Sequence, residues 1–149
     1  MFLLDTDHVV IAQQQSAPEY DRLIHRVRHY DPDDFFVSAV SFHEQVMGWN
    51  AYISRAKNSA GVVRGYARLL GVLANFSEAQ VLPFDDMAAE VFDDLRTQGV
   101  RIGTMDLRIA AIGLARDLTV LSRNLVDFGR VPGLQVEDWT AGSPQRDRP

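Results

Sequence analysis

Short apolar runs without helical periodicity alternate along the chain with longer segments whose apolar residues recur every three or four positions. Runs of the first kind are typical of buried strands, and segments of the second kind are typical of amphipathic helices. Strands are predicted at residues 2–4, 35–40, 81–84, 119–122 and, as an edge strand, 134–136. Because strands and helices alternate, we expect an α/β fold: a three-layer sandwich in which helices cover both faces of a mostly parallel sheet of four or five strands.

Two serine–glutamate pairs, Ser16 with Glu19 and Ser41 with Glu44, have the spacing of a capping box and predict the starts of two helices. The second helix is long, and a polar break at residues 57–61 separates it from a further apolar stripe. This pattern predicts a helical hairpin on one side of the sheet. Further helix boundaries are predicted at Asp85 and Thr104, as N-caps, and at Gly99, as a helix stop.

With 149 residues, of which 46% are hydrophobic, the chain is long enough for one domain with a substantial core and too short for two. We assign residues 1–140 to this domain and expect the polar residues 141–149 to form a disordered tail. The chain has no cysteine, which excludes disulfides and cysteine nucleophiles and fits a cytoplasmic protein. Asp5 and Asp7 interrupt the first apolar run, and no stretch approaches the roughly 18 apolar residues of a membrane span, so we expect neither a signal peptide nor a membrane partner.

The formal charge of −5 argues at first against a nucleic-acid partner, because phosphate contacts need a cationic surface. Five of the 20 acidic residues, however, are candidates for a single site: Asp5, Asp7, Glu44, Asp106 and Asp127. The acidic residues that remain are as numerous as the 15 basic ones, so the rest of the surface is neutral overall. The net charge therefore does not exclude an RNA substrate.

The candidate site residues lie where predicted strands end or helices begin. Asp5 directly follows the first strand, Glu44 and Asp106 lie in the first turns of predicted helices, and Asn124 and Asp127 follow the strand at 119–122. The carboxyl ends of parallel strands meet at one edge of a sheet, so we expect these side chains to converge there. Each acid taken singly fits an ordinary role at a helix start, but a group of mutually repelling carboxylates indicates a hard cation, Mg²⁺ or Mn²⁺.

Five segments, in this order, resemble motifs of the PIN-domain ribonucleases, and more narrowly of the VapC-type toxins of toxin–antitoxin pairs. They are residues 3–7, residues 41–48 around Glu44, residues 81–85, residues 102–111 around Asp106, and residues 122–128. The resemblance extends over nearly the whole chain, from Phe2 to about Trp139.

The resemblance implies a Mg²⁺-dependent endoribonuclease in which Asp5, Glu44 and Asp106 bind the metal and act in catalysis. Asp7 stands where the family usually has Asn, and Asn124 stands where some members carry a fourth acid. Asn124 is therefore a candidate catalytic residue, whereas the nearby Asp127 either replaces it as a metal ligand or braces the turn by pairing with a neighbouring arginine. The resemblance also implies an RNA substrate, a cognate antitoxin and a homodimer.

Two other functions are compatible with the sequence. Residues 2–7 also resemble the start of haloacid-dehalogenase-type phosphatases, in which Asp5 would be the nucleophile and Asp85 with Asp86 a late acidic pair. Those enzymes need a basic residue near the phosphate, and the chain's one lysine, Lys57, falls in a polar break. The second alternative is a PIN-like module that binds RNA without cleaving it, although such a module has no use for a cluster of repelling carboxylates.

Overall fold

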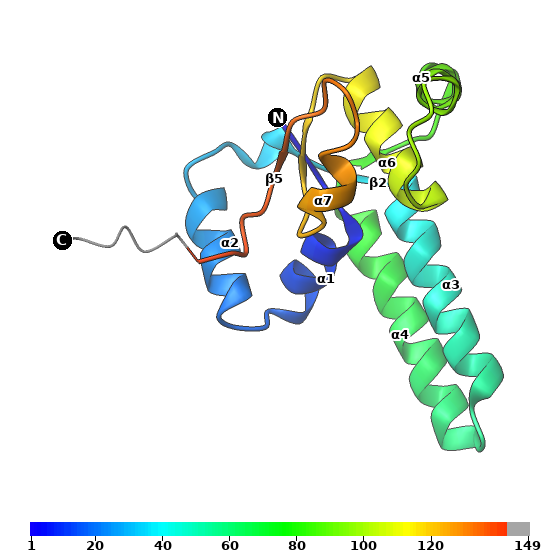
Figure 1. Ribbon diagram of the computed structural model, residues 1–149. Helices are drawn as coiled ribbons and strands as arrows, with labels where there is room; N and C mark the ends of the chain where they lie inside the picture. Colours follow the sequence, from blue (N-terminus) through cyan, green and yellow to red (C-terminus); the bar gives the residue numbers. More distant parts are fainter. Residues whose placement is uncertain (143–149) are drawn as a thin grey trace.

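The computed structural model describes residues 1–142, and its centre is a five-stranded sheet with the strand order β3-β2-β1-β4-β5 (Figure 1). All paired strands run parallel, which confirms the predicted α/β fold class. The predicted disordered tail at 141–149 lies outside the described residues except for its first two positions. The strands are β1 (Phe2–Leu4), β2 (Phe35–Ser38), β3 (Val81–Leu82), β4 (Thr119–Leu121) and β5 (Val136–Glu137).

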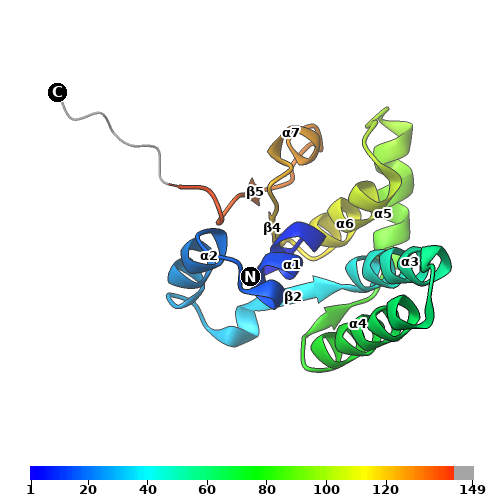
Figure 2. The same ribbon diagram turned by 90° about the horizontal axis from the view of Figure 1, so that it is seen from below.

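Helices cover both faces of the sheet, as the near-continuous apolar character of the strands requires. Leu3 of β1 is fully buried against α5 and α6, whereas its neighbour Phe2 packs on the opposite face with Leu23 of α2. In Figure 2, α5 and α6 lie on one side of β2 and α4 lies on the other. Within residues 1–142 the helices are α1 (Thr6–Gln14), α2 (Glu19–Val27), a short 3₁₀ helix (Pro32–Asp34), α3 (Ala39–Arg55), α4 (Ser59–Ser77), α5 (Asp86–Thr97), α6 (Thr104–Ala115) and α7 (Leu125–Phe128).

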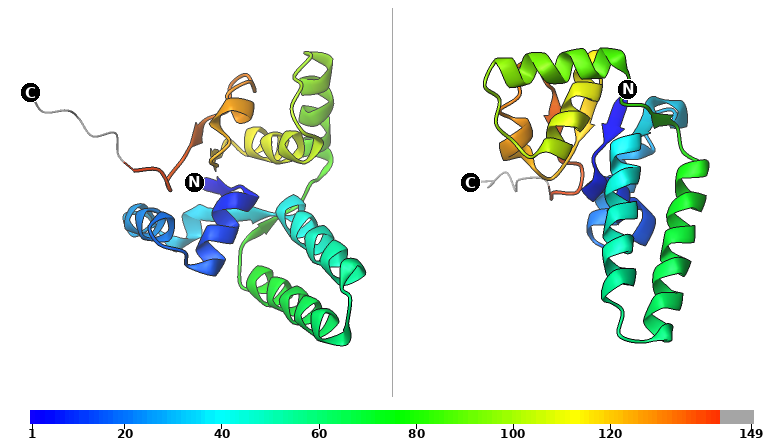
Figure 3. Two further views of the ribbon diagram at one scale, coloured as in Figure 1. Left: turned by 60° about the horizontal axis from the view of Figure 1, so that its bottom comes forward. Right: turned by 90° about the vertical axis from the view of Figure 1, so that its right-hand side faces the viewer.

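The predicted helical hairpin is formed by α3 and α4, which extend well beyond the sheet (Figure 3). The two helices approach closely at Gly65, where any Cβ atom would overlap the side chain of Ile53. Asn58 caps α4 by accepting a hydrogen bond from the Gly61 N–H, so the polar break at 57–61 forms the turn of the hairpin. In residues 1–142, no helix is both long enough and apolar enough to cross a membrane.

Three predicted helix starts are wrong in detail. Helix α3 begins at Ala39, and its N-cap is Ser38, whose hydroxyl accepts a hydrogen bond from the Ser41 N–H. The helix starts earlier than predicted because β2 ends at Ser38, and this leaves Glu44 free of any capping role. Pro18 precedes α2 without a side-chain cap, so the pair formed by residues 16 and 19 is not a capping box, and α6 is preceded by Gly103 rather than capped by its first residue, Thr104.

Candidate active site

Asp5 lies at the carboxyl end of β1 and is the N-cap of α1. Its Oδ1 accepts a hydrogen bond from the Thr6 N–H (2.8 Å), and its Oδ2 accepts one from the Ser122 hydroxyl (2.8 Å). Ser122 directly follows β4, which pairs with β1 in parallel, so the sheet itself brings these two residues together. Only 6% of Asp5 is exposed to solvent.

The pKa of Asp5 is raised to about 7, chiefly because burial removes the water that stabilises a carboxylate. The hydrogen bond from Ser122 opposes this rise, whereas the negative charges of Asp7 and Asp106 contribute to it. Near neutral pH a substantial fraction of Asp5 is therefore protonated when no cation is present. A divalent cation bound beside it would favour the ionised form and offset the desolvation.

Glu44 approaches the same edge from α3. Its Oε1 accepts a hydrogen bond from the Thr6 hydroxyl (2.9 Å), so Thr6 links the first turn of α1 to α3. Burial raises the pKa of Glu44, the Thr6 hydrogen bond opposes the rise, and the charge of Asp106 adds to it. The coupling to Asp106 places the two carboxylates within electrostatic reach of each other.

Asp106 lies in the first turn of α6, and its Oδ2 accepts a hydrogen bond from the Asn124 side-chain amide (3.2 Å). Burial raises the pKa of Asp106, and the charges of Asp127 and Asp7 raise it further against the effect of the Asn124 hydrogen bond. The tertiary structure thus gathers Asp5, Glu44 and Asp106 from three separate elements. Within residues 1–142 none of the three forms an ion pair; the acids that pair with arginines are Glu137, Asp85 and Asp127.

The side chain of Asn124 lies at the acidic site and takes part in three hydrogen bonds. Its amide oxygen accepts the Asp127 N–H (3.4 Å) as the N-cap of α7, while its amide nitrogen donates to Asp106 and to Asp127 Oδ2 (3.0 Å). The group that faces Asp106 is therefore a donor rather than a metal-binding oxygen. Asp127 also lies 3.6 Å from Arg130 Nη1, which is the turn-bracing contact that the sequence offered as one of its two roles.

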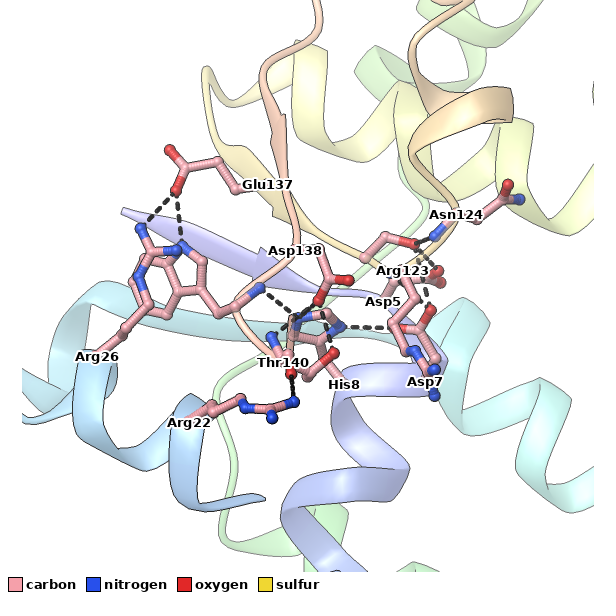
Figure 4. Close-up of polar contacts among 12 residues, drawn as sticks. Asp5, Asp7, His8, Arg22, Arg26, Arg123, Asn124, Glu137, Asp138 and Thr140 are labelled. Atoms are coloured by element: carbon pink, nitrogen blue, oxygen red, sulfur yellow. Dashed lines mark hydrogen bonds and ion pairs between the residues drawn. The ribbon is translucent and has the colours of Figure 1, made fainter. Parts of the chain in front are cut away.

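Asp7 accepts its two shortest hydrogen bonds from His8 and from the Arg123 backbone, and sequence analysis did not single out His8. Its Oδ1 lies 2.7 Å from His8 Nδ1, and its Oδ2 accepts the Arg123 N–H at 2.9 Å (Figure 4). Burial by itself would raise the pKa of Asp7, but the hydrogen bonds from His8 and Arg123 outweigh it and lower that pKa. The available sequence signal was a histidine inside the apolar run that follows Asp7.

The chemistry of these side chains fits a hard divalent cation, since Asp5, Glu44 and Asp106 offer only oxygen ligands and have raised pKa values in the metal-free state. In the described part of the chain, however, no three acidic or histidine side chains already stand as a compact metal-binding cluster. A cation held by all three carboxylates therefore requires side-chain rotation as it binds.

The phosphatase alternative lacks its basic residue. Lys57 lies in the turn between α3 and α4, at the tip of the hairpin in Figure 1. Asp85, which that alternative assigned to the late acidic pair, caps α5 through the Ala88 N–H and lies 2.7 Å from Arg116 Nη2. Lys57 therefore lies in a turn and Asp85 caps a helix, and neither residue places a positive charge beside Asp5.

Sequence comparison relates the whole chain to known proteins. No protein-family model matches the chain. The chain is 28% identical over 142 residues to the tRNA(fMet)-specific endonuclease VapC of Salmonella typhimurium, an alignment that covers 93% of this chain and 97% of that protein.

Solved structures extend the comparison to the fold. The crystal structure of DNA-bound VapBC from Salmonella typhimurium matches with a TM-score of 0.66 and 25% identity over 93% of this chain and 97% of the matched chain. VapBC-1 from nontypeable Haemophilus influenzae matches in fold, with a TM-score of 0.72 and 21% identity over 94% of this chain and 98% of the matched chain. The sequence match to the Salmonella typhimurium relative spans both proteins almost end to end. In sequence and in fold, the chain is therefore similar to VapC endonucleases and to the VapBC complexes that contain them.

Proposed function

We propose that this chain is a divalent-metal-dependent endoribonuclease and the toxin of a toxin–antitoxin pair. The observation that carries the proposal is the convergence of Asp5, Glu44 and Asp106 at one sheet edge, each with a raised pKa and none in an ion pair within residues 1–142. The endonuclease name of the Salmonella typhimurium relative supports RNA as the substrate class.

Asp5, Glu44 and Asp106 are the residues that would hold Mg²⁺ or Mn²⁺. When bound, such a cation orients a phosphodiester, lowers the pKa of a water molecule and stabilises charge on the leaving oxygen. No protein nucleophile is needed for that chemistry.

Hydrogen bonds from uncharged side chains keep each proposed ligand in place. Ser122 holds Asp5, Thr6 holds Glu44, and Asn124 holds Asp106. Each donor fixes one oxygen of its carboxylate and leaves the other lone pairs available, which limits the reorganisation that metal binding requires. Thr6 and Ser122 therefore act on the carboxylates in this proposal, rather than on the RNA phosphate directly.

Cleavage of a structured RNA tests the proposal. Purified protein should cleave transcribed initiator tRNA in Mg²⁺ or Mn²⁺ and lose that activity in EDTA, and Asp106→Asn should abolish cleavage without unfolding the protein. Cleavage that survives EDTA would refute the metal mechanism. A protein that binds RNA but cleaves none, and whose thermal stability does not respond to divalent cations, would favour the non-catalytic module.

The partner is proposed to be an antitoxin protein, because the matched structures are VapBC complexes. We also propose that residues 1–140 act as one domain, that the protein is cytoplasmic, and that two copies form a homodimer. Exposed apolar side chains on α4, namely Tyr66, Leu70 and Leu73, provide surface for protein contacts. Co-expression with the product of a neighbouring short gene, followed by size-exclusion chromatography with light scattering, measures both associations.

A further inference from the structure

His8 occupies an unusual place for an ionisable side chain. It lies in the first turn of α1, is fully buried at 0% exposure, and contacts polar groups through both ring nitrogens. Nδ1 lies 2.7 Å from Asp7 Oδ1 (Figure 4). Nε2 accepts a hydrogen bond from the Trp139 backbone N–H at 3.2 Å. The ring therefore spans the distance between the acidic site and the segment that follows β5.

The hydrogen-bond pattern selects one tautomer. A backbone N–H can only donate, so the Nε2 atom that accepts from Trp139 carries no proton. The proton of the neutral ring must then be on Nδ1, where it is donated to Asp7. Asp138 Oδ1 lies 3.7 Å from Nε2, which is too far for a hydrogen bond, and it accepts from the Thr140 N–H (2.8 Å) and the Thr140 hydroxyl (2.6 Å).

Asp7 passes this constraint to the turn after β4. Its second oxygen, Oδ2, accepts the Arg123 N–H at 2.9 Å and lies 3.4 Å from the Ser122 hydroxyl. Ser122 in turn donates to Asp5 and accepts the Asn124 N–H at 3.0 Å. One carboxylate thus ties the first turn of α1 to the turn that carries two contacts of the acidic site.

The far end of the network is firmly anchored. Trp139 is 1% exposed, its indole N–H donates to Glu137 Oε2 (2.7 Å), and the Arg26 guanidinium lies 4.6 Å above its ring. Arg22 of α2 donates to the Thr140 carbonyl at 3.2 Å. The Trp139 N–H is therefore held in a fixed position against α1, and it can set the orientation of the imidazole.

We infer that His8 is a positioning residue: its Nδ1–H orients the Asp7 carboxylate, which holds the Ser122–Asn124 turn in the geometry that the acidic site needs. His8 contacts neither Asp5 nor the other proposed metal ligands in this arrangement, and it acts through Asp7 alone. The inference rests on the proposed function for its effect on cleavage, but the tautomer and the order of the turn can be measured without any activity.

Two substitutions separate the two ring nitrogens. In His8→Asn the amide nitrogen comes near the position of Nδ1 and can still donate to Asp7, whereas in His8→Gln the amide reaches the position of Nε2, so the contact with Trp139 is retained and the donor to Asp7 is lost. We expect His8→Gln to lower kcat on transcribed initiator tRNA by about tenfold with KM nearly unchanged, an effect of the size that one hydrogen bond supplies. The kcat of His8→Asn should stay close to the wild-type value.

The matched control is Leu95→Ala on α5, which truncates a side chain buried in the core cluster formed largely by α5 and α6; His8, Asp7 and Trp139 are not members of that cluster. It should lower thermal stability while kcat stays near the wild-type value. If His8→Gln affected only stability, it would behave like this control. Equal kcat values for wild type and His8→Gln, or equal losses in the Gln and Asn variants, would overturn the inference.

Two readouts on metal-free protein are independent of cleavage. Nitrogen-15 NMR of the wild-type ring should show a protonated Nδ1 and an unprotonated Nε2, and a protonated Nε2 would overturn the inference. Hydrogen exchange at the Arg123 amide, whose proton is donated to Asp7, should be faster by about tenfold in His8→Gln and close to wild type in His8→Asn. If wild type fails to cleave RNA while these two results hold, the proposed function is refuted and the positioning geometry stands; unchanged exchange in His8→Gln refutes the positioning role.

Discussion

Replacing Asp5 by Asn should stabilise the metal-free protein, by an amount that depends on pH. The pKa of Asp5 is about 7 in the folded protein and 3.8 in an unfolded chain. Between these two pH values the folded protein holds a proton that the unfolded chain has lost, so stability falls as pH rises. Each unit of pKa difference corresponds to about 1.4 kcal/mol. The ionisable Asp5 side chain therefore lowers the free energy of unfolding by about 4 kcal/mol at pH 8, by about 1.5 kcal/mol at pH 5, and by almost nothing below about pH 4.

The neighbouring groups can accept an amide in place of the carboxylate. In Asp5→Asn the amide oxygen would still accept the Thr6 N–H, and the amide nitrogen would meet the Ser122 hydroxyl, which can accept as well as donate. We therefore expect Asp5→Asn to raise the free energy of unfolding by about 2–4 kcal/mol at pH 8, equivalent to a Tm increase of roughly 5–15 °C, and by about 1 kcal/mol at pH 5.

Thermal unfolding in EDTA at pH 5 and pH 8 measures both values. Asp94→Asn, which removes an exposed acid from α5, is the matched control and should leave Tm close to that of wild type at either pH. A second arm with Mg²⁺ should raise the Tm of wild type and leave that of Asp5→Asn unchanged, because the variant lacks the charged ligand. If the Tm of Asp5→Asn were lower than that of wild type at pH 8, or if its increase in Tm over wild type were the same at pH 5 and pH 8, the reasoning would be refuted.

Further outcomes concern the remaining site residues. Asn124→Asp should keep activity and tighten metal binding, but it should lower the metal-free Tm because a second carboxylate would then face Asp106; Asn124→Ala should weaken both activity and metal affinity, as measured by cleavage rates and Mn²⁺ titration. Asp127→Ala should mainly lower stability, by about 1 kcal/mol, because its exposed pair with Arg130 and its contact with Asn124 are lost. Loss of cleavage with Tm unchanged would instead make Asp127 the fourth acid. Asp7→Asn should reduce cleavage about as much as His8→Gln and far less than Asp5→Asn, since its amide oxygen can still accept the hydrogen bond from His8 or the one from Arg123; a loss as severe as that of Asp5→Asn would contradict the nuclease assignment.

The alternation of apolar runs and amphipathic stripes was sufficient to predict the class of fold. Apolar runs such as residues 2–4 have no helical period, and a strand of that kind is stable only when both its faces are covered. The sheet, the hairpin of α3 and α4, and the capping of α5 by Asp85 follow from such local signals. The starts of α2 and α3 did not, because a capping box is a matter of spacing, whereas the actual N-cap depends on where the preceding strand leaves the sheet.

The sequence by itself also determined which carboxylates could form a site, since parallel strands deliver their carboxyl ends to one edge. Tertiary structure decided how those carboxylates are held. The pairing of β1 with β4 brings the Ser122 hydroxyl to Asp5, and the packing of α3 brings Glu44 to the Thr6 hydroxyl, contacts between residues 117 and 38 positions apart in the chain. The role of His8 was equally invisible in the sequence, because its second partner is a backbone N–H 131 residues away. Local patterns specify which groups are charged or buried, but hydrogen bonds act over about 3 Å, and only the folded chain brings their donors and acceptors that close.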